Sequence, residues 1–449
     1  MARPLTRVPT PLLIIFGLVN LPLSMLMSPT AAILPVYYLD YSAVTLAGLA
    51  TATLVARMFD GITDPMIGFL SDRVGTRKPW MIGGALMVSA GVWFLYSPEP
   101  DAGLPYLLLW YMMVTLGWTL VEIPHTAMAA ELSGDYQERS RIALWRQLLG
   151  FVGGVMFMAS PMLLIGGTTS FSPDVMRVLA VFIMIALPVA VALMCWLVPE
   201  PRRRLRSRRL SLADLWLALR NTPPLQYFLI TQILFGLATG AVASLFVIYA
   251  SRYLGLADKI PQIAMPMTLA MAAGMPLWLQ IMKRVDKHRA WAAAGIGMIV
   301  TLALVPALAP GSGALGPMIV IMAMFGFFLG LSSIALPSLL ADLVDYDLWK
   351  NGKDRAAIFF SFQALVTKIN QAVGGAIALF IPTLFGFTGK GELSADAALG
   401  LKLAFVAWPS LLLLPMIVLA WRYPLDRRAH GVLARRLATR RQVVEQGPS

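Results

Sequence analysis

The stretch RMFDGITDPMIGFLSDRVGTRKPW, residues 57–80, places charged side chains inside an otherwise apolar segment. Asp60 and Asp64 stand one helical turn apart, and Arg57 lies on the same helix face three residues before Asp60. A charge buried in a bilayer costs at least about 2.5 kcal/mol on insertion scales. We therefore expect this helix to turn its charges toward the interior of a helix bundle, where they serve a function.

The composition around this stretch predicts a protein embedded in a membrane. Of the 449 residues, 58% are hydrophobic and 13% are charged, and the mean hydropathy is +0.73. A bilayer core of about 30 Å needs roughly 20 apolar residues per helix, so a chain of this length holds about a dozen spans. The single cysteine, Cys195, excludes a disulfide framework and a cysteine-based metal cluster.

Hydropathy predicts twelve spans in two sets of six. They lie near 11–37, 44–70, 80–97, 105–131, 142–166 and 176–198, and then near 223–251, 261–282, 291–309, 315–341, 357–386 and 399–421. We expect an all-α membrane protein with two pseudo-symmetric six-helix halves, 1–198 and 223–421. A basic linker at 199–222 joins the halves, and a basic cytoplasmic tail occupies 422–449. Within the linker, SLADLWLAL predicts a helix on the inner membrane surface, with a solvated linker as the alternative.

The basic residues predict the orientation of the chain. A net charge of +13 is compatible with nucleic-acid binding, but the Lys and Arg residues fall mostly in short gaps between apolar runs. If both termini are cytoplasmic, 28 of the 36 basic residues lie on the inner side and five on the outer side. We therefore expect a multi-pass protein of the inner (cytoplasmic) membrane, surrounded by the lipid bilayer, with both termini cytoplasmic and no nucleic-acid partner.

The paired aspartates form a candidate cation site. Two carboxylates this close in a low dielectric repel each other unless one holds a proton or a cation lies between them. Thr63 and Thr119 offer further oxygen ligands for a hard cation. The sequence therefore predicts a site for H⁺ or Na⁺ at Asp60 and Asp64, with no other metal or cofactor. The alternative is a structural role in which Arg57 neutralises Asp60 and Asp64 caps a broken helix.

Other spans carry ionisable groups that suit a polar substrate. Glu122 and Arg146 lie in the fourth and fifth spans, and the rigid fork of donors on an arginine grips polar groups well. A permanent salt bridge between helices is the alternative for this pair. Trp118 precedes Glu122 by one turn and is a candidate for the substrate face. We interpret His125, three residues after Glu122, as an interface histidine.

Charge counting also suggests how ion binding is coupled to transport. Three basic residues within spans, Arg57, Arg146 and Lys368, can balance the three acids in the second and fourth spans. If a bound cation replaces one basic partner, ion binding is linked to helix rearrangement. Arg57 and Lys368 are therefore candidate coupling residues.

The loop after the second span resembles the inner-loop signature of the major facilitator superfamily. The match runs through GFLSDRVGTRK, at Gly68, Asp72, Arg73, Gly75, Arg77 and Lys78. The resemblance implies the major facilitator fold, with these residues at an inner gate. There, Gly68 would permit close helix approach, and Asp72 would form a charge clasp with the basic residues.

Within that superfamily, RMFDGITDPMIG resembles the glycoside-pentoside-hexuronide:cation symporters, the family of melibiose permease. ADLVDYDLWKNGKDRAAIFFSFQALVTK, before and into the eleventh span, and EIP in the fourth span support the same family. The resemblance implies a cation site at Asp60 and Asp64, aided by Thr119. It also implies a substrate-side acid, a substrate-side arginine and a coupling lysine, at Glu122, Arg146 and Lys368.

The chain departs from the pattern of the sugar carriers in that family. Its first span has no acid where they have a carboxylate, and offers Asn20 and Ser24 instead. Thr126 stands where they have a tryptophan, Glu122 replaces an aspartate, and Thr63 replaces an asparagine between the paired aspartates. We take Asn20, Ser24 and Thr126 as candidate substrate contacts.

These observations predict a secondary active transporter that couples H⁺ or Na⁺ to a sugar, glycoside or related small polar solute by alternating access. A lysolipid-like amphipathic substrate is the leading alternative, since the chain is rich in methionine and lacks the acid of the first span. A non-transporting membrane scaffold and a membrane-embedded enzyme are less favoured. The sequence contains no P-loop for ATP drive. We expect a monomer that binds a small-molecule substrate.

Overall fold

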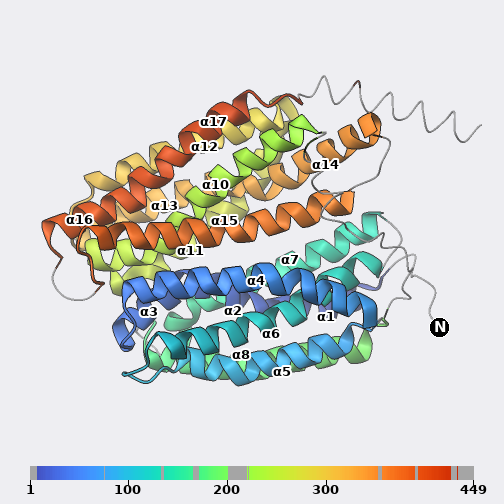
Figure 1. The fold of residues 1–449 in the computed structure, drawn as a ribbon, viewed down its shortest axis with the longest axis horizontal. Helices are drawn as coiled ribbons and strands as arrows, with labels where there is room; N and C mark the ends of the chain where they lie inside the picture. The colour runs from blue at the N-terminus through green and yellow to red at the C-terminus, as the bar shows by residue number, and fades with distance from the viewer. Residues whose placement is uncertain are drawn as a thin grey trace, which may run out of the picture. The chain divides into compact units, whose positions relative to one another are not determined.

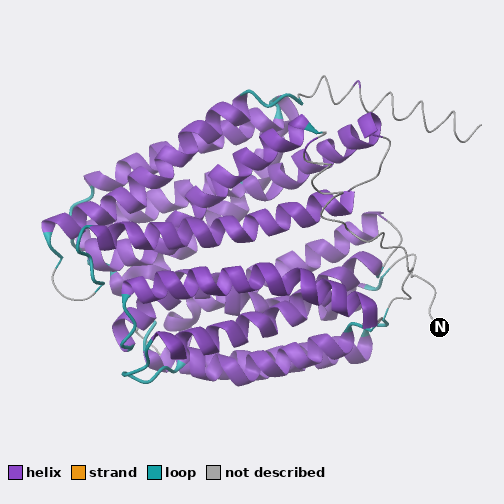
Figure 2. Cartoon of the chain, viewed as in Figure 1, coloured by secondary structure: helices purple, strands orange, loops and turns teal. Residues whose placement is uncertain are grey.

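The computed structural model describes residues 8–74, 76–132, 136–164, 171–200, 220, 222–351, 356–389, 393–425 and 432. These residues form helices joined by loops, with no strand among them (Figures 1 and 2). The helix predicted at 211–219 and most of the predicted tail lie outside the described residues.

Eight α-helices precede the central linker. They are α1 (Thr10–Leu18), α2 (Asn20–Ala32), α3 (Leu34–Tyr41), α4 (Leu46–Val74), α5 (Lys78–Tyr96), α6 (Leu104–Glu131), α7 (Tyr136–Leu164) and α8 (Pro173–Leu197).

The helices after the linker include short 3₁₀ and π segments. They are α10 (Pro223–Ile248), η1 (Tyr249–Tyr253), η2 (Ala257–Lys259), α11 (Ile260–Arg284), α12 (Lys287–Leu304), η3 (Val305–Ala307), η4 (Ser312–Ala314), α13 (Leu315–Gly330), α14 (Ser332–Asn351), α15 (Ala356–Leu384), α16 (Ala395–Lys402), η5 (Leu403–Ala407) and α17 (Trp408–Trp421).

The twelve predicted spans all correspond to helices or to consecutive helices, which confirms the predicted all-α membrane protein. Eleven helical stretches of the described chain are long and apolar enough to cross a membrane. The remaining span is α4, whose 29 residues extend about 44 Å at 1.5 Å per residue. It has the length of a membrane helix, and its charged residues lower its mean hydropathy.

The first predicted span is broken into α1, α2 and α3 by two prolines. Pro22 has no N–H to donate to the carbonyl of Leu18, where α1 ends. Pro35 likewise has none for the carbonyl of Ala31, and α2 ends at the next residue. The first break makes Asn20 the opening residue of α2.

The chain forms two compact units. Unit 1 comprises Met1–Arg206, Ala243–Met265 and Gly375–Leu401, and unit 2 comprises Ser207–Val242, Pro266–Gly374 and Lys402–Ser449. In unit 1, α6 packs against α4 and α5, and α7 packs against α1 and α2. In unit 2, α12 contacts α13, α14 and α17 around the buried Trp291. The predicted halves, 1–198 and 223–421, group the spans by their order along the chain. That division stays a prediction.

Candidate functional site

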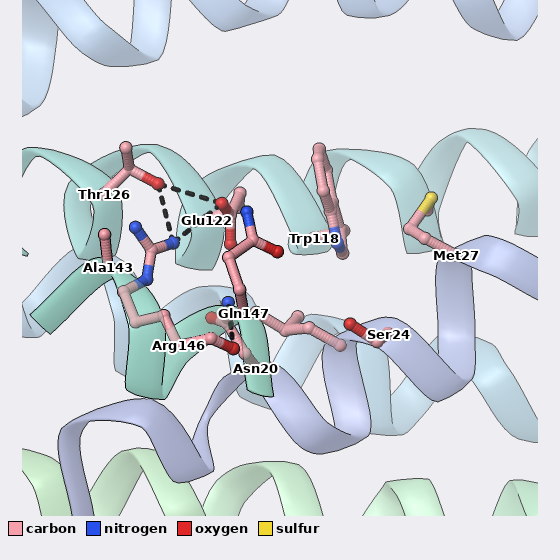
Figure 3. A pocket seen from close by; sticks show the side chains of 10 residues that line it. Asn20, Ser24, Met27, Trp118, Glu122, Thr126, Ala143, Arg146 and Gln147 are labelled. Carbon is pink, nitrogen blue, oxygen red and sulfur yellow. Dashed lines mark hydrogen bonds and ion pairs between the residues drawn. The ribbon is translucent and has the colours of Figure 1, made fainter. Parts of the chain in front are cut away.

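A cavity of about 400 Å³ lies within unit 1, between α2, α6 and α7 (Figure 3). Polar side chains from all three helices reach it. Its lining residues are Asn20, Leu23, Ser24 and Met27 of α2, Trp118, Glu122 and Thr126 of α6, and Ala143, Arg146 and Gln147 of α7.

A carboxylate, a guanidinium and a hydroxyl are linked on the cavity wall. Arg146 Nη2 donates to Glu122 Oε1 and to Thr126 Oγ1, both at 2.9 Å. Thr126 Oγ1 donates to the same carboxylate oxygen at 2.9 Å (Figure 3). Thr126 follows Glu122 by one turn of α6, so the helix itself aligns these two groups. The arrangement presents a neutralised ion pair to the cavity, with the arginine side chain 11% exposed and the glutamate side chain 26% exposed.

Two polar atoms on the same wall are buried without a hydrogen-bond partner among the described residues. One is the donor Nε of Arg146 and the other is the acceptor Oδ1 of Asn20. The amide nitrogen of Asn20 donates to the backbone oxygen of Arg146 at 3.4 Å, so the two residues are neighbours. Because buried polar groups normally have partners, an unsatisfied donor beside an unsatisfied acceptor is a feature of a ligand site.

A glycine brings α7 close enough to α2 to form this wall. A Cβ atom on Gly153 would lie 2.2 Å from the backbone oxygen of Leu21, so a larger residue would force the helices apart. Leu21 is next to Asn20 in sequence and three residues before Ser24. The close approach therefore holds α2, with its two polar side chains, beside the helix that carries Arg146.

All six residues that the sequence analysis nominated for substrate binding lie around this one cavity: Asn20, Ser24, Trp118, Glu122, Thr126 and Arg146. Four lining residues were not predicted. Leu23 and Met27 follow Asn20 by three and seven residues, and Ala143 precedes Arg146 by three, so helical spacing from a nominated residue would have found them. Gln147 is next to Arg146, and a polar residue within an apolar span could have indicated that it lines the cavity.

The nominated cation-binding residues lie on α4 and α6. Asp60 is 2% exposed, Thr63 is 3% exposed and Thr119 is fully buried. In contrast, Met58 and Ile62 of α4 are 64% and 70% exposed. The second span therefore turns polar groups inward and apolar groups outward, the arrangement expected of a membrane helix that carries charge.

The oxygen atoms of these residues differ in what they contact. Thr63 Oγ1 donates to the backbone oxygen of Phe59 at 3.0 Å, which leaves its lone pairs available as acceptors. Thr119 Oγ1 is buried and has no hydrogen-bond partner among the described residues. Asp64 is half-buried on the same helix as Asp60. The packing of α4 against α6 brings the helices that carry these four residues together.

Of the two predicted coupling residues, the structure describes the side chain of one. Lys368 is half-buried on α15 in unit 2, whereas the side chain of Arg57 lies outside the described residues. Among the residues that the structure describes, no group of three or more His, Cys, Asp or Glu side chains could hold a metal ion.

At the predicted inner gate, the side chain of Lys78 and the backbone of Arg77 contact the end of α8 and the residues after it. Lys78 Nζ donates to the carbonyl oxygens of Cys195 at 2.7 Å and Val198 at 2.8 Å. A cation is favourable there, because the last carbonyls of a helix lack partners and carry partial negative charge. The backbone N–H of Arg77 donates to Glu200 Oε1 at 2.5 Å. Sequence reasoning missed these partners.

Most of the remaining residues of the predicted gate are exposed or not fully described. Arg73 is exposed, Gly75 lies outside the described residues, and so does the side chain of Asp72, so the predicted charge clasp is not described. A Cβ atom on Gly68 would meet the side chain of Ile123 at 3.8 Å, an ordinary contact. The close helix approach expected at Gly68 stays a prediction.

The corresponding loop of unit 2 lies between α11 and α12. Lys287 Nζ donates to both carboxylate oxygens of Asp342 on α14, at 2.8 and 2.7 Å. The buried Tyr423 follows α17, with its ring centroid 5.8 Å from that of His288. Burial, and then the nearby Asp342 carboxylate, hold the pKa of Tyr423 well above its usual value.

Comparison with known proteins gives a family match over nearly the whole chain. A family model described as "MFS/sugar transport protein" matches residues 15–427. The chain is 23% identical over 91% of both chains to the glucuronide carrier protein homolog of Escherichia coli (strain K12). It is 26% identical to the inner membrane symporter YicJ of the same organism, over 86% of this chain and 85% of that one.

The chain is also similar to a mammalian transporter in sequence and to a solved transporter structure in fold. The chain is 24% identical to the sphingosine-1-phosphate transporter MFSD2B of Mus musculus, over 82% of this chain and 79% of that one. The crystal structure of the nucleoside transporter NupG matches with a TM-score of 0.68 at 12% identity, over 91% of this chain and 98% of that one. At that identity the structural match establishes the fold alone.

Proposed function

The chain belongs to the MFS/sugar transport protein family, and on that premise we propose that it is a cation-coupled symporter of a sugar, glycoside or related small polar solute. Family membership makes it a multi-pass membrane transporter and not an enzyme. We further propose that it works as a monomer in the inner membrane, where one of its relatives is named as a symporter.

The observation that carries the substrate proposal is the composition of the cavity wall. Its volume of about 400 Å³ falls in the usual range for small-molecule sites, roughly 300–1,000 Å³. Sugar hydroxyls both donate and accept hydrogen bonds, which suits the unsatisfied Arg146 Nε and Asn20 Oδ1. The indole of Trp118 offers an apolar face to the C–H groups of a sugar ring. These features support a polar, ring-shaped solute.

The paired aspartates of α4 support coupling to a cation. Asp60 is almost fully buried, and a buried carboxylate needs a basic side chain, a proton or a bound cation to offset its charge. Thr63, Thr119 and Asp64 supply further oxygens on the same two packed helices. We propose that H⁺ or Na⁺ binds there, that Arg57 and Lys368 respond to the change in charge, and that the cavity opens alternately to the two sides of the membrane.

An amphipathic lysolipid-like substrate is the second candidate. One relative is named as a sphingosine-1-phosphate transporter, and the same cavity carries the apolar side chains of Leu23 and Met27 beside its polar groups. Arg146 would then hold a charged headgroup. Including lysolipids among the substrates tested for uptake distinguishes this candidate from a sugar.

The test is uptake into proteoliposomes with sugars, glycosides and lysolipids, each with and without a Na⁺ gradient and over a range of pH. We expect a sugar or glycoside to accumulate under an ion gradient in the wild type. Asp64→Asn should abolish accumulation, because the substituted amide cannot carry the negative charge that attracts the cation. The matched control is Asp101→Asn, an exposed aspartate between α5 and α6, which should accumulate substrate as the wild type does. Normal accumulation by the Asp64 variant under the same gradient would refute the cation site.

A further inference from the structure

His125 is a buried, polar residue of α6 that the proposed transport mechanism does not use. It is fully buried and stands between Pro124 and Thr126, one turn after Glu122. Three residues of the cavity wall therefore share its helix: Trp118, Glu122 and Thr126. A polar ring enclosed in the packed interior of a membrane protein needs a partner to offset its desolvation.

The imidazole interacts with Phe16 of α1 in two ways, while its Nδ1 is buried without a hydrogen-bond partner among the described residues. Nε2 lies 2.9 Å from the backbone oxygen of Phe16, and the ring stacks on the Phe16 ring with centroids 4.2 Å apart and planes inclined by 28°. Because a carbonyl oxygen only accepts, the hydrogen bond requires a proton on Nε2. The histidine therefore ties α6 to the last turn of α1, two residues before that helix ends.

The same turn of α1 is held from α7. A Cβ atom on Gly17 would lie 3.0 Å from the backbone oxygen of Trp145, the residue before Arg146. The chain then breaks and restarts at Asn20, whose amide donates to the backbone oxygen of Arg146. Phe16 and Gly17 are thus fixed between α6 and α7 just before the break that sets the direction of α2.

We propose that His125 is a positioning residue of the substrate cavity. Its hydrogen bond to Phe16 sets how far α2, with Asn20 and Ser24, lies from Glu122 and Thr126 on α6. The proposal rests on the proposed function insofar as the cavity binds the transported solute. It assigns to His125 no contact with the solute and no proton transfer.

One test separates substrate affinity from turnover with three variants. His125→Phe keeps a ring to stack on Phe16 but removes the donor, and His125→Asn is too short to reach the Phe16 carbonyl. His125→Gln keeps an amide donor of similar reach. We expect the Phe and Asn variants to raise KM for uptake by about 2- to 10-fold, the range for one lost hydrogen bond, with Vmax changed less than twofold. The Gln variant should restore most of the affinity.

A second readout needs no substrate. Cys195 is the chain's single cysteine, so Cys195→Ala followed by Ser24→Cys places one reporter thiol on the cavity wall. We expect His125→Phe or His125→Asn to change the alkylation rate of that thiol by a small hydrophilic reagent about 2- to 10-fold, and His125→Gln to return it toward the parent rate.

The two readouts distinguish failure of this proposal from failure of the proposed function. If no sugar or glycoside is carried, yet the alkylation rate responds as stated, the transport proposal fails and the positioning role of His125 stands. If the alkylation rate is the same in all variants that fold, the positioning role is wrong, whatever the substrate proves to be. A variant that loses its fold is replaced by the other donor-free variant.

Discussion

Glu122 and Arg146 are the two charged residues on the cavity wall, and we propose that they govern what the cavity binds. Arg146 donates from one nitrogen to both Glu122 and Thr126, so its planar fork is already oriented before a ligand arrives. A site whose donors are held in place loses less entropy when it binds a solute. The pair is therefore best understood as a pre-organised polar platform.

We expect Arg146→Lys to weaken substrate binding about 10-fold. A lysine keeps the positive charge, but it lacks the remaining donors of the planar guanidinium, including the Nε that has no partner among the described residues. Equilibrium binding of the substrate found in the uptake screen, measured in detergent, checks this. Unchanged affinity in the lysine variant would show that the fork geometry is irrelevant.

We expect Glu122→Gln to lower the stability of the protein, because it leaves the mostly buried guanidinium of Arg146 without a carboxylate partner. Removing one partner of a fully buried ion pair costs about 3–5 kcal/mol. Because the Glu122 side chain is 26% exposed, we expect its loss to lower the free energy of unfolding by about 1–3 kcal/mol. The control is Asp174→Asn, which breaks an exposed pair with Arg177 and should change stability by less than about 0.5 kcal/mol. Chemical denaturation in detergent measures both. Equal stability of the two variants would contradict the assignment.

The residues that the sequence identified were those whose chemistry is unusual in an apolar span. Glu122 and Arg146 stand out because charge is costly in a bilayer, and the structure places both on the cavity wall. Leu23 and Met27 line the same cavity but look like any residue that faces lipid. The partners of Lys78 were unpredictable for another reason: they are backbone carbonyls at the end of α8, brought near by tertiary packing and carrying no sequence signal.

Among the elements, the first span supplies one wall of the cavity through α2. Hydropathy predicted one continuous span at 11–37, and the structure has three helices there because Pro22 and Pro35 interrupt the hydrogen-bond ladder. Hydropathy averages over a window and does not register such a break. Proline positions were the available signal, and the first break is what brings Asn20 to the start of α2.

Gly153 tests the packing of α2 on α7. Gly153→Ala would place a methyl group 2.2 Å from the backbone oxygen of Leu21, and a backbone atom within a helix cannot move aside as a side chain can. We expect a loss of about 1–3 kcal/mol in unfolding free energy and a raised KM, because α2 carries Asn20 and Ser24. Thermal unfolding in detergent and the uptake assay provide the two measurements.

The adjacent residue is a matched control. A Cβ atom on Gly154 would have no neighbour within 4 Å. Gly154→Ala should therefore leave KM unchanged and raise stability by up to about 1 kcal/mol, since alanine favours a helix more than glycine does. If both alanine variants behaved alike, the close approach at Gly153 would not be what holds the wall together.

For the whole molecule, the order of the spans follows from hydropathy, and α4 shows where that signal is weakest. Its length of 29 residues suits a membrane helix, yet its charges reduce its apolarity. If those charges are functional, α4 is a membrane span and the number of spans is even. An even number of spans places both termini on the same side of the membrane.

The asymmetry of basic residues then predicts that both termini lie on the cytoplasmic side. With both termini inside, 28 of the 36 Lys and Arg residues lie in inner segments, against five in outer ones. Short basic loops resist translocation, so the opposite orientation would require the most basic segments to cross the bilayer. The prediction concerns the whole chain, because each loop constrains its neighbours through the alternation of spans.

Reporter fusions check this orientation. Alkaline phosphatase is active only where its disulfides form, outside the cytoplasm, whereas a green fluorescent protein folds and fluoresces inside. We expect a phosphatase joined after Ser449 to be inactive and a fluorescent reporter there to be bright. A phosphatase joined at Asp101, in the loop between α5 and α6, should be active because an odd number of spans precedes it. Phosphatase activity at the C-terminal junction together with none at Asp101 would invert the topology and assign the Lys78 and Lys287 contacts to the outer side of the membrane.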